Sequence, residues 1–263
     1  MRRMRTYERY VAIGDSTSEG LDDPDGRGGY RGWANRLAER LAEEQGSVLY
    51  ANLAVRGRTT RQIREQQLEP ALAMRPDLVT VVSGTNDLLR RSFDLKALGA
   101  DVEAMQRAFT GTGATVLTFT LPDMSAVMPL ARLFRERLLH MNDRLREISA
   151  QTGAIVCDLA AYPVASDPRL WSDDRLHANS VGHARIAEAL ADHAGLPGAT
   201  RAWSEPLPDA PPRSAFDVVR AEVSWLRIHF LPWIWRHARG RSSGDGISPK
   251  FPQLTHFAAR TMP

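Results

Sequence analysis

Short apolar runs alternate with longer amphipathic stretches along about the first four-fifths of the chain. The short runs are β-branched or apolar, and most meet Gly, Pro, Ser or Asp at one end, which is typical of buried strands. We therefore expect strands at Tyr10 to Gly14, Val48 to Leu53, Leu78 to Ser83, Thr115 to Thr120 and Ala154 to Asp158.

The stretches between these runs repeat their apolar residues at helical spacing. Trp33, Leu37 and Leu41 fall on one helix face, as do Ile186 and Leu190 further along the chain. The expected helices are Trp33 to Glu44, Asp94 to Thr110, Leu130 to Gln151 and Val181 to Asp192.

Strands that alternate with helices favour a parallel sheet covered by helices on both faces. We predict an α/β fold with three layers, α/β/α, around a five-stranded parallel sheet in a flavodoxin-like arrangement. In such sheets ligands bind beyond the carboxyl ends of the strands. Functional residues should therefore follow directly after strands.

The pattern changes after residue 200. A cluster of prolines predicts a stiff linker over residues 201–213. Apolar residues then recur at steps of three and four from Phe216 to Trp235, which predicts an amphipathic helix that Pro232 kinks or ends. We therefore divide the chain into a main domain (1–200), a Pro-rich linker (201–213) and a basic, amphipathic helical extension (214–263), whose last residues we expect to be extended or disordered.

Charge separates the extension from the main domain. The chain carries a net charge of +3, and from Arg213 onward we count eight basic and three acidic residues, so this stretch carries +5 and the rest of the chain 3 − 5 = −2. A basic extension on a slightly acidic body favours an anionic partner. We expect no nucleic-acid partner; peripheral membrane contact or a homodimer through the helix, and docking of the helix on the body, remain open.

Other features restrict the class of protein. Cys157 is the only cysteine, which excludes an intrachain disulfide and a cysteine-rich metal site. The basic start is not followed by a long apolar run and a small-residue cleavage site, so we expect no signal peptide. Because no apolar run is long enough to span a bilayer, we expect a cytoplasmic protein.

The first candidate for chemistry is Gly14-Asp15-Ser16, directly after the first expected strand. A serine hydroxyl is a weak nucleophile unless a base removes its proton. Taken alone, this tripeptide is better explained as a polar turn between a strand and a loop.

Three further segments change this interpretation. Asn52 to Gly57 follows the second strand, Gly84 to Asp87 follows the third, and Asp174-Arg175-Leu176-His177 precedes the last expected helix. Neighbouring strands in a flavodoxin-like order would bring Ser16, Gly57 and Asn86 together. A nucleophile beside several hydrogen-bond donors is what acyl transfer requires.

The four segments resemble the signature blocks of the SGNH (GDSL-like) hydrolase superfamily, in order, over roughly Tyr7 to His193. The resemblance implies that Ser16 is the nucleophile of a Ser-His-Asp triad completed by His177 and Asp174. It also implies an oxyanion hole formed by the backbone N–H groups of Ser16 and Gly57 and the side chain of Asn86. Such an enzyme needs no cofactor and no metal, and we expect it to hydrolyse small esters with short, acetyl-like acyl groups. One departure is Thr17, where the name-giving motif has leucine.

Alternatives to this interpretation remain. Asp173 adjoins Asp174, although the spacing to His177 favours Asp174. A metal-dependent phosphoesterase would use Asp15, Asn86, Asp87 and His177 as metal ligands. Such a site needs several histidines at short spacings, and this sequence lacks them. A lysophospholipase or thioesterase acting at a membrane surface fits the extension, as does a non-catalytic module that binds lipid or a partner.

The loop after the fourth strand, Leu121 to Leu130, is apolar and contains Met124 and Met128. Methionine side chains adapt their shape. These two residues are therefore candidates for an acyl pocket, although the loop could simply pack on the following helix.

Overall fold

A mixed sheet forms the centre of the protein in a computed structural model that describes residues 6–210, 214–232 and 243–259. Within these ranges the sheet has six strands in the order β5-β4-β3-β1-β2-β6. The first five strands along the chain are parallel to one another. They are β1 (Arg9–Gly14), β2 (Ser47–Asn52), β3 (Leu78–Val82), β4 (Thr115–Phe119) and β5 (Ile155–Cys157).

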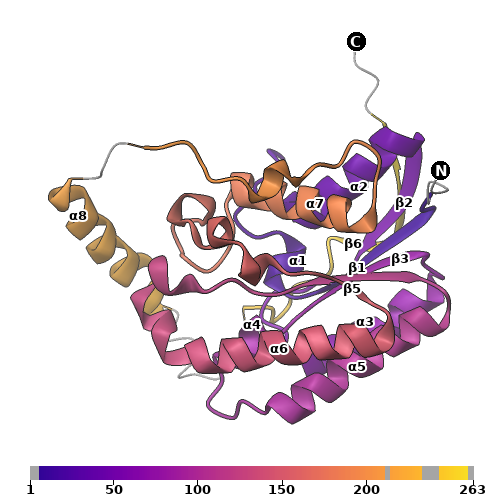
Figure 1. Cartoon of the computed structure of the whole chain (residues 1–263), viewed down its shortest axis with the longest axis horizontal. Coiled ribbons are helices and arrows are strands. Elements are labelled where there is room, and N and C mark those ends of the chain that lie inside the picture. Colours follow the sequence, from indigo (N-terminus) through magenta and orange to yellow (C-terminus); the bar gives the residue numbers. More distant parts are fainter. Residues whose placement is uncertain (1–5, 211–213, 233–242, 260–263) are drawn as a thin grey trace.

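Helices cover both faces of the sheet and make three layers (Figure 1). One face carries α2 (Gly32–Gln45) and α7 (Ser180–Ala194), and the other carries α3 (Thr60–Ala73), α5 (Leu95–Gly111) and α6 (Arg135–Thr152). The predicted α/β class and the flavodoxin-like order of the parallel strands are confirmed.

The apolar faces identified in the sequence form the core between these layers. Trp33, Leu37 and Leu41 of α2 are fully buried in one cluster with Tyr10 of β1. Phe109 of α5 belongs to a second cluster on the opposite face of the sheet. Burying side chains of this size stabilises the fold by roughly 1.5–3 kcal/mol each, which is why the spacing of apolar residues predicted these helices.

Short elements follow the strand ends and connect the larger helices. Two of them start at the expected functional segments, namely α1 (Ser16–Glu19) after β1 and α4 (Thr85–Leu88) after β3. The 3₁₀ turns are η1 (Met124–Ala126), η2 (Pro129–Phe134), η3 (Leu159–Ala161), η4 (Pro163–Ser166), η5 (Pro168–Leu170) and η6 (Arg201–Ser204).

The sheet has one strand more than the five predicted. The additional strand, β6 (Phe251–Ala258), pairs antiparallel with β2, so the sheet is mixed rather than wholly parallel. Its sequence gave a weak signal, because only Phe251, Leu254 and Phe257 are even partly buried. Phe251 and Phe257 pack on Tyr50 of β2, with ring centroids 5.6 and 5.1 Å from the Tyr50 ring.

Helix α3 was not predicted. Its apolar residues are sparse, and Pro70 lies inside it, where proline normally interrupts a helix. Thr59 and Gln62 form a capping box at its start, which compensates for this weak propensity.

The predicted C-terminal helix is present as α8 (Ala215–Trp225), continued by the π-helix η7 (Leu226–Phe230). Trp233 to Trp235, the end of the predicted helix, lie outside the described residues. In the predicted linker, Trp203 is buried and packs on Tyr162 at a centroid distance of 4.6 Å. The division into main domain, linker and extension stays a prediction. No helix within the described residues is long and apolar enough to cross a membrane.

We predict that Phe257→Ala lowers the free energy of unfolding by about 2 kcal/mol, less than the roughly 3–5 kcal/mol of a fully buried phenylalanine. The substitution removes the ring that packs edge-on against Tyr50. Denaturant unfolding monitored by circular dichroism measures the change. Thr255→Ala, at an exposed position of the same strand, is the control. Equal loss in both variants would show that β6 does not stabilise the sheet through this cluster.

Candidate active site

The turn after β1 places Ser16 at the carboxyl edge of the sheet. Gly14 ends the strand where a Cβ atom would lie 2.6 Å from the carbonyl oxygen of Val82, so no other residue fits there without displacement. The side chain of Gln67 on α3 accepts from Gly14 N–H at 2.8 Å and donates to Gly14 C=O at 2.9 Å. This pair of hydrogen bonds fixes the strand end immediately before the serine.

A chain of hydrogen bonds links Ser16 to His177 and Asp174. Ser16 Oγ lies 2.8 Å from His177 Nε2, and His177 Nδ1 lies 2.6 Å from Asp174 Oδ2. The Ser16 side chain is largely buried, with 6% of the residue exposed. The structure thus brings together the three residues that the sequence indicated, in the order nucleophile, base and acid that serine hydrolases use.

The loop before α7 holds Asp174 firmly. Asp174 Oδ1 accepts the backbone N–H groups of Leu176 and His177 at 2.8 and 2.9 Å, and the hydroxyl of Ser172 at 2.7 Å. Asp173, the alternative carboxylate, is exposed. The three-residue spacing therefore allows Asp174 to bind both the backbone and the ring of His177.

The electrostatics of this pair favour a charged carboxylate beside a basic imidazole. Burial opposes ionisation of Asp174, but hydrogen bonds from His177 and Ser172 and the charge of His177 lower its pKa well below the usual range. Burial likewise tends to lower the pKa of His177. The hydrogen bond and charge of Asp174, with the charges of Asp22 and Asp15, outweigh burial and raise the pKa of His177 above its ordinary value.

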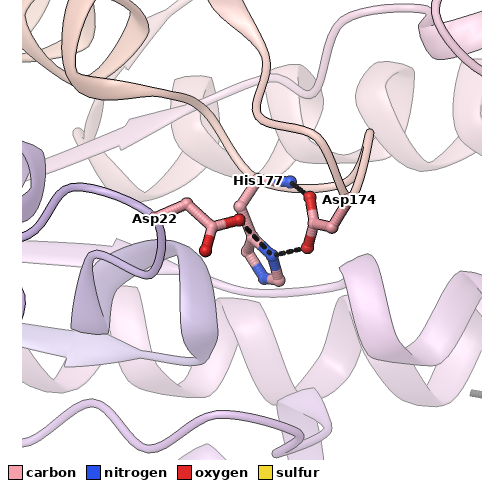
Figure 2. Close-up of side chains that lie close together, drawn as sticks. All are labelled: Asp22, Asp174 and His177. Carbon is pink, nitrogen blue, oxygen red and sulfur yellow. Dashed lines mark hydrogen bonds and ion pairs between the residues drawn. The ribbon is translucent and has the colours of Figure 1, made fainter. Parts of the chain in front are cut away.

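A second carboxylate, Asp22, lies beside the same imidazole (Figure 2). Asp22 Oδ2 is 4.0 Å from His177 Nδ1. The same carboxylate oxygen lies 2.5 Å from Ser172 Oγ. Together Asp22, Asp174 and His177 offer ligand atoms close enough to hold a cation. However, the 2.6 Å contact between His177 and Asp174 has the geometry of a hydrogen bond, because two ligands of one zinc ion lie roughly 3 Å or more apart given bonds of about 2 Å.

The two remaining strand-end segments lie beside the serine segment, and their role in an oxyanion hole stays a prediction. The loop after β2 rests on the serine segment, because Val55 N–H donates to Gly14 C=O at 3.3 Å and Arg56 N–H donates to Glu19 of α1 at 2.8 Å. Gly57 follows with a φ of +74°, in the left-handed region that favours glycine.

Asn86 lies on α4, at the end of β3. Its side-chain Nδ2 donates to Asp15 Oδ2 at 3.2 Å and to the carbonyl oxygen of Arg58 at 3.0 Å. Both hydrogens of the amide are therefore engaged in this state. The bond to Asp15 is the longer of the two.

Asp15 and Asp87, which the phosphoesterase alternative needs as metal ligands, are hydrogen-bonded inside the protein. Asp15 caps α1 by accepting from Thr17 N–H at 3.0 Å, and burial raises its pKa to about 6. Asp87 accepts the backbone N–H and the hydroxyl of Thr60, each at 2.9 Å, and burial raises its pKa as well. Asp15 thereby joins the serine turn to Asn86 of α4, and Asp87 joins α4 to the start of α3.

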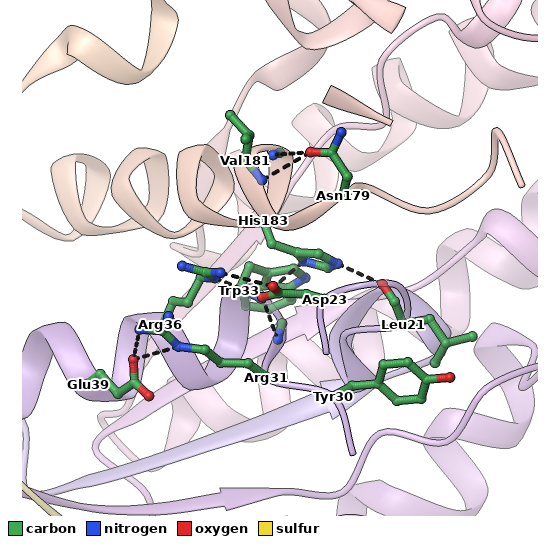
Figure 3. A network of polar contacts seen from close by, with 12 residues as sticks. Leu21, Asp23, Tyr30, Arg31, Trp33, Arg36, Glu39, Asn179, Val181 and His183 are labelled. Atoms are coloured by element: carbon green, nitrogen blue, oxygen red, sulfur yellow. Dashed lines mark hydrogen bonds and ion pairs between the residues drawn. The ribbon is translucent and has the colours of Figure 1, made fainter. Parts of the chain in front are cut away.

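A buried network holds the loop that carries Asp22 (Figure 3). His183 of α7 accepts from Trp33 N–H at 3.1 Å and donates to Leu21 C=O at 2.9 Å. Burial lowers the pKa of His183 to about 4, so the ring is neutral near pH 7. In the same network Asp23 binds Arg36 through two hydrogen bonds of 2.8 and 2.9 Å.

Sequence reasoning missed Gln67 and Glu19 as parts of this site, and it did not identify Asp22 as a neighbour of the imidazole. Gln67 is a polar residue at a buried helical position, and Glu19 lies within the serine segment itself. Asp22 has a φ of +65°, which is uncommon outside glycine, but no sequence pattern indicates this backbone conformation. Met124 and Met128 are partly buried around η1, and their role in substrate binding stays a prediction.

Comparisons with known proteins agree with this geometry. A family model described as GDSL-like lipase/acylhydrolase family matches residues 12–185. An acetylxylan esterase of Geobacillus stearothermophilus is 24% identical over 215 residues, which are 72% of this chain and 94% of that protein.

Solved structures share the fold. The crystal structure of TesA aligns with a TM-score of 0.59 at 21% identity, covering 71% of this chain and 97% of TesA. A catalytic mutant of Axe2, an acetylxylan esterase from Geobacillus stearothermophilus, aligns with a TM-score of 0.60 at 17% identity, covering 79% of this chain and all of that chain, 100%.

We predict that Asp22→Asn lowers the pKa of His177, because the negative charge that favours the imidazolium is removed. Titration of the His177 ring signals by NMR measures the change. Asp173→Asn removes an equal charge from an exposed neighbour of Asp174 and should change the pKa of His177 less. An unchanged value in Asp22→Asn would show that solvent screens this carboxylate from the ring.

Proposed function

Because the chain belongs to the GDSL-like lipase/acylhydrolase family, and is thus a carboxylic ester hydrolase, we propose that it cleaves short-chain acyl esters through a Ser16–His177–Asp174 triad. The observation that carries the proposal is the unbroken hydrogen-bond chain from Ser16 Oγ through both ring nitrogens of His177 to Asp174. A purely structural histidine needs neither a serine hydroxyl nor a carboxylate arranged in this way.

The first step is attack by Ser16 on the ester carbonyl. His177 Nε2, 2.8 Å from Ser16 Oγ, takes the hydroxyl proton as the new C–O bond forms. Asp174 accepts a hydrogen bond from Nδ1–H, which keeps the proton of the neutral ring on Nδ1 and presents an unprotonated Nε2 to the serine. The same carboxylate stabilises the imidazolium that results.

The carbonyl oxygen becomes an oxyanion during this attack. The groups proposed to stabilise it are the backbone N–H groups of Ser16 and Gly57 and the side-chain amide of Asn86. In the resting state the Asn86 amide donates to Asp15 and Arg58. A developing negative charge would compete for the longer of these bonds, which makes the Asn86 interaction strongest in the transition state.

The tetrahedral intermediate then collapses. His177 protonates the departing alcohol, and the acyl group remains on Ser16 Oγ. His177 then deprotonates a water molecule as it attacks the acyl-enzyme. When this second tetrahedral intermediate breaks its bond to Ser16 Oγ, the carboxylic acid leaves and His177 returns the proton to the serine. Every proton in both half-reactions passes through the same ring nitrogen.

The acyl group is proposed to be acetyl or similarly short. Support comes from the relative of Geobacillus stearothermophilus, which is named an acetylxylan esterase. Met124 and Met128 remain the candidates to contact the acyl chain. The cytoplasmic location stays a prediction.

A second candidate is a lysophospholipase- or thioesterase-type acyl hydrolase that acts at a membrane surface. The observation that favours it is the outer surface of α8 and η7, where the apolar residues Val223, Leu226 and Ile228 are 42–64% exposed. Arg220 and Arg227 are exposed on the same segment. Basic and apolar side chains together suit an anionic lipid surface.

Contact with a second copy of the chain through these residues also stays a prediction. A non-catalytic module is no longer an alternative, because the chain is an ester hydrolase.

We predict that Ser16→Ala removes almost all activity against aryl esters with acyl chains from two to about twelve carbons, while Ser18→Ala, on the same turn, keeps most of it. The wild type should hydrolyse the acetyl ester with the highest kcat/KM. Retained activity in a folded Ser16→Ala protein would overturn the triad. Activity that rises with chain length, and rises further on anionic vesicles, would favour the second candidate.

We predict that Asn86→Ala lowers kcat by roughly 10²–10³-fold, the usual cost of one oxyanion donor. KM should change little, because the donor acts mainly in the transition state. Arg90→Ala, at an exposed position just after α4, is the control. A change confined to KM would instead place Asn86 in substrate binding. Thermal unfolding of each variant measures any loss of stability that comes from losing the hydrogen bond to Asp15, and so separates it from a loss of catalysis.

A further inference from the structure

The chain after residue 213 contacts both sides of the proposed triad. We call its described parts, residues 214–232 and 243–259, the C-terminal segment. The family match ends at residue 185, so these contacts are additions to the part of the chain that the family shares. They fall on the backbone around Asp174 and on the helix that begins at Ser16.

The first contact comes from Trp225, at the end of α8. Its indole Nε1–H donates to the backbone carbonyl of Asp174 at 3.0 Å. The side chain is buried, with 7% of the residue exposed. A buried indole N–H needs an acceptor, and here that acceptor belongs to the proposed catalytic acid.

The second contact fixes the next residue of the loop. Arg175 has a φ of +62°, in the left-handed region that is unusual for arginine. Its guanidinium donates to both carboxylate oxygens of Glu222 at 2.8 and 2.7 Å and lies over the Trp225 ring, 4.9 Å from the ring centroid. A two-point ion pair and a stacked ring restrict a guanidinium more than a single contact does. Helix α8 therefore constrains both the carbonyl of Asp174 and the side chain of Arg175.

These constraints reach the imidazole through Asp174. The same carboxylate accepts the backbone N–H and the ring Nδ1–H of His177. A shift of the Asp174 backbone would therefore change the direction of His177 Nε2 relative to Ser16. Catalysis is sensitive to such changes, since a displacement of about 1 Å can cost roughly 10²-fold in rate.

The third contact lies on the serine side. Lys250, just before β6, donates from Nζ to the carbonyl oxygens of Glu19, Tyr30 and Arg31 at 2.7, 3.1 and 2.9 Å. Glu19 is the last residue of α1, which starts at Ser16. The ammonium has three donors, and all three are used to join the end of this turn to the loop before α2. Pairing of β6 with β2 anchors the lysine at the sheet edge.

From these contacts we propose that the C-terminal segment is a positioning element of the active site. Trp225 and Glu222 hold the loop that carries Asp174 and His177, while Lys250 holds the turn that carries Ser16. The inference rests on the proposed triad, and it adds residues that orient the triad without contacting the substrate.

The test uses full-length variants at the α8 contact. Trp225→Phe removes the indole N–H but keeps an aromatic ring, and Glu222→Gln removes the charge but keeps the shape. Both should lower kcat for an aryl acetate by about tenfold, a part of the loss expected for full misplacement, with KM within about twofold. Ser224→Ala, exposed on the same helix, should match the wild type.

The pH profile separates positioning from mere stability. Asp174 raises the pKa of His177, so a loosened Asp174 should move the acidic limb of kcat/KM to lower pH in Trp225→Phe. Rates are expressed per serine that reacts with a fluorophosphonate, which counts correctly folded sites. Unchanged kcat and an unchanged limb, with only a lower melting temperature, would overturn the proposal for α8.

Lys250 is tested separately. Lys250→Arg keeps a cation and should retain more activity than Lys250→Met, which leaves the three carbonyls without their donor. Equal kcat per reactive serine in both variants would overturn the proposal for the serine side. Ser16→Ala separates failure of the triad from failure of the positioning role. If Ser16→Ala stays active, the proposed triad is wrong. If Ser16→Ala is inactive and Trp225→Phe is fully active, only the positioning role is rejected.

Discussion

The hydrogen bond between Ser16 Oγ and His177 Nε2 joins residues 161 positions apart in the chain, and most of the fold can be understood from what this bond requires. Ser16 must leave the sheet at the end of β1, in a turn that only glycine at position 14 permits. His177 must arrive from the loop before α7 with its ring already oriented by Asp174. The parallel sheet supplies the first condition, and the packing of α7 on α2 and the sheet supplies the second.

Burial and neighbouring carboxylates together set the pKa of the imidazole in this bond. The imidazole sits among carboxylates that favour its charged form, while burial opposes charge. His183, only six residues further along, binds backbone groups through both ring nitrogens, and burial lowers its pKa to about 4 despite the charge of Asp23. The two histidines thus differ in pKa because the ring of one binds Asp174, whereas the ring of the other binds Trp33 N–H and Leu21 C=O.

Sequence reasoning recovered those features that depend on local spacing. Apolar periodicity located β1 to β5 and the helices α2, α5, α6 and α7, and the polar segments after strands identified the residues that meet at the sheet edge. It did not find α3, whose apolar positions are few and whose interior contains Pro70. It also missed β6, because an edge strand with one partly covered face has little apolar pattern.

The supporting groups of the site were harder to predict. Gln67, Lys250 and Trp225 act through backbone atoms of residues far away in the sequence, at separations of 53, 231 and 51 positions respectively. A polar side chain that binds a distant carbonyl leaves no motif, since any residue can supply a carbonyl. The proposed catalytic groups could be recognised in the sequence because their chemistry restricts residue type, whereas the groups proposed to position them are restricted only by the fold.

The central claim is that Ser16 is the nucleophile activated by His177. Treating the full-length protein with a fluorophosphonate and mapping the adduct by peptide mass spectrometry tests it most directly. We expect a single adduct on Ser16. We also expect this adduct to form much more slowly when His177 is replaced by alanine. An adduct on another serine, or labelling of Ser16 that does not depend on His177, would contradict it.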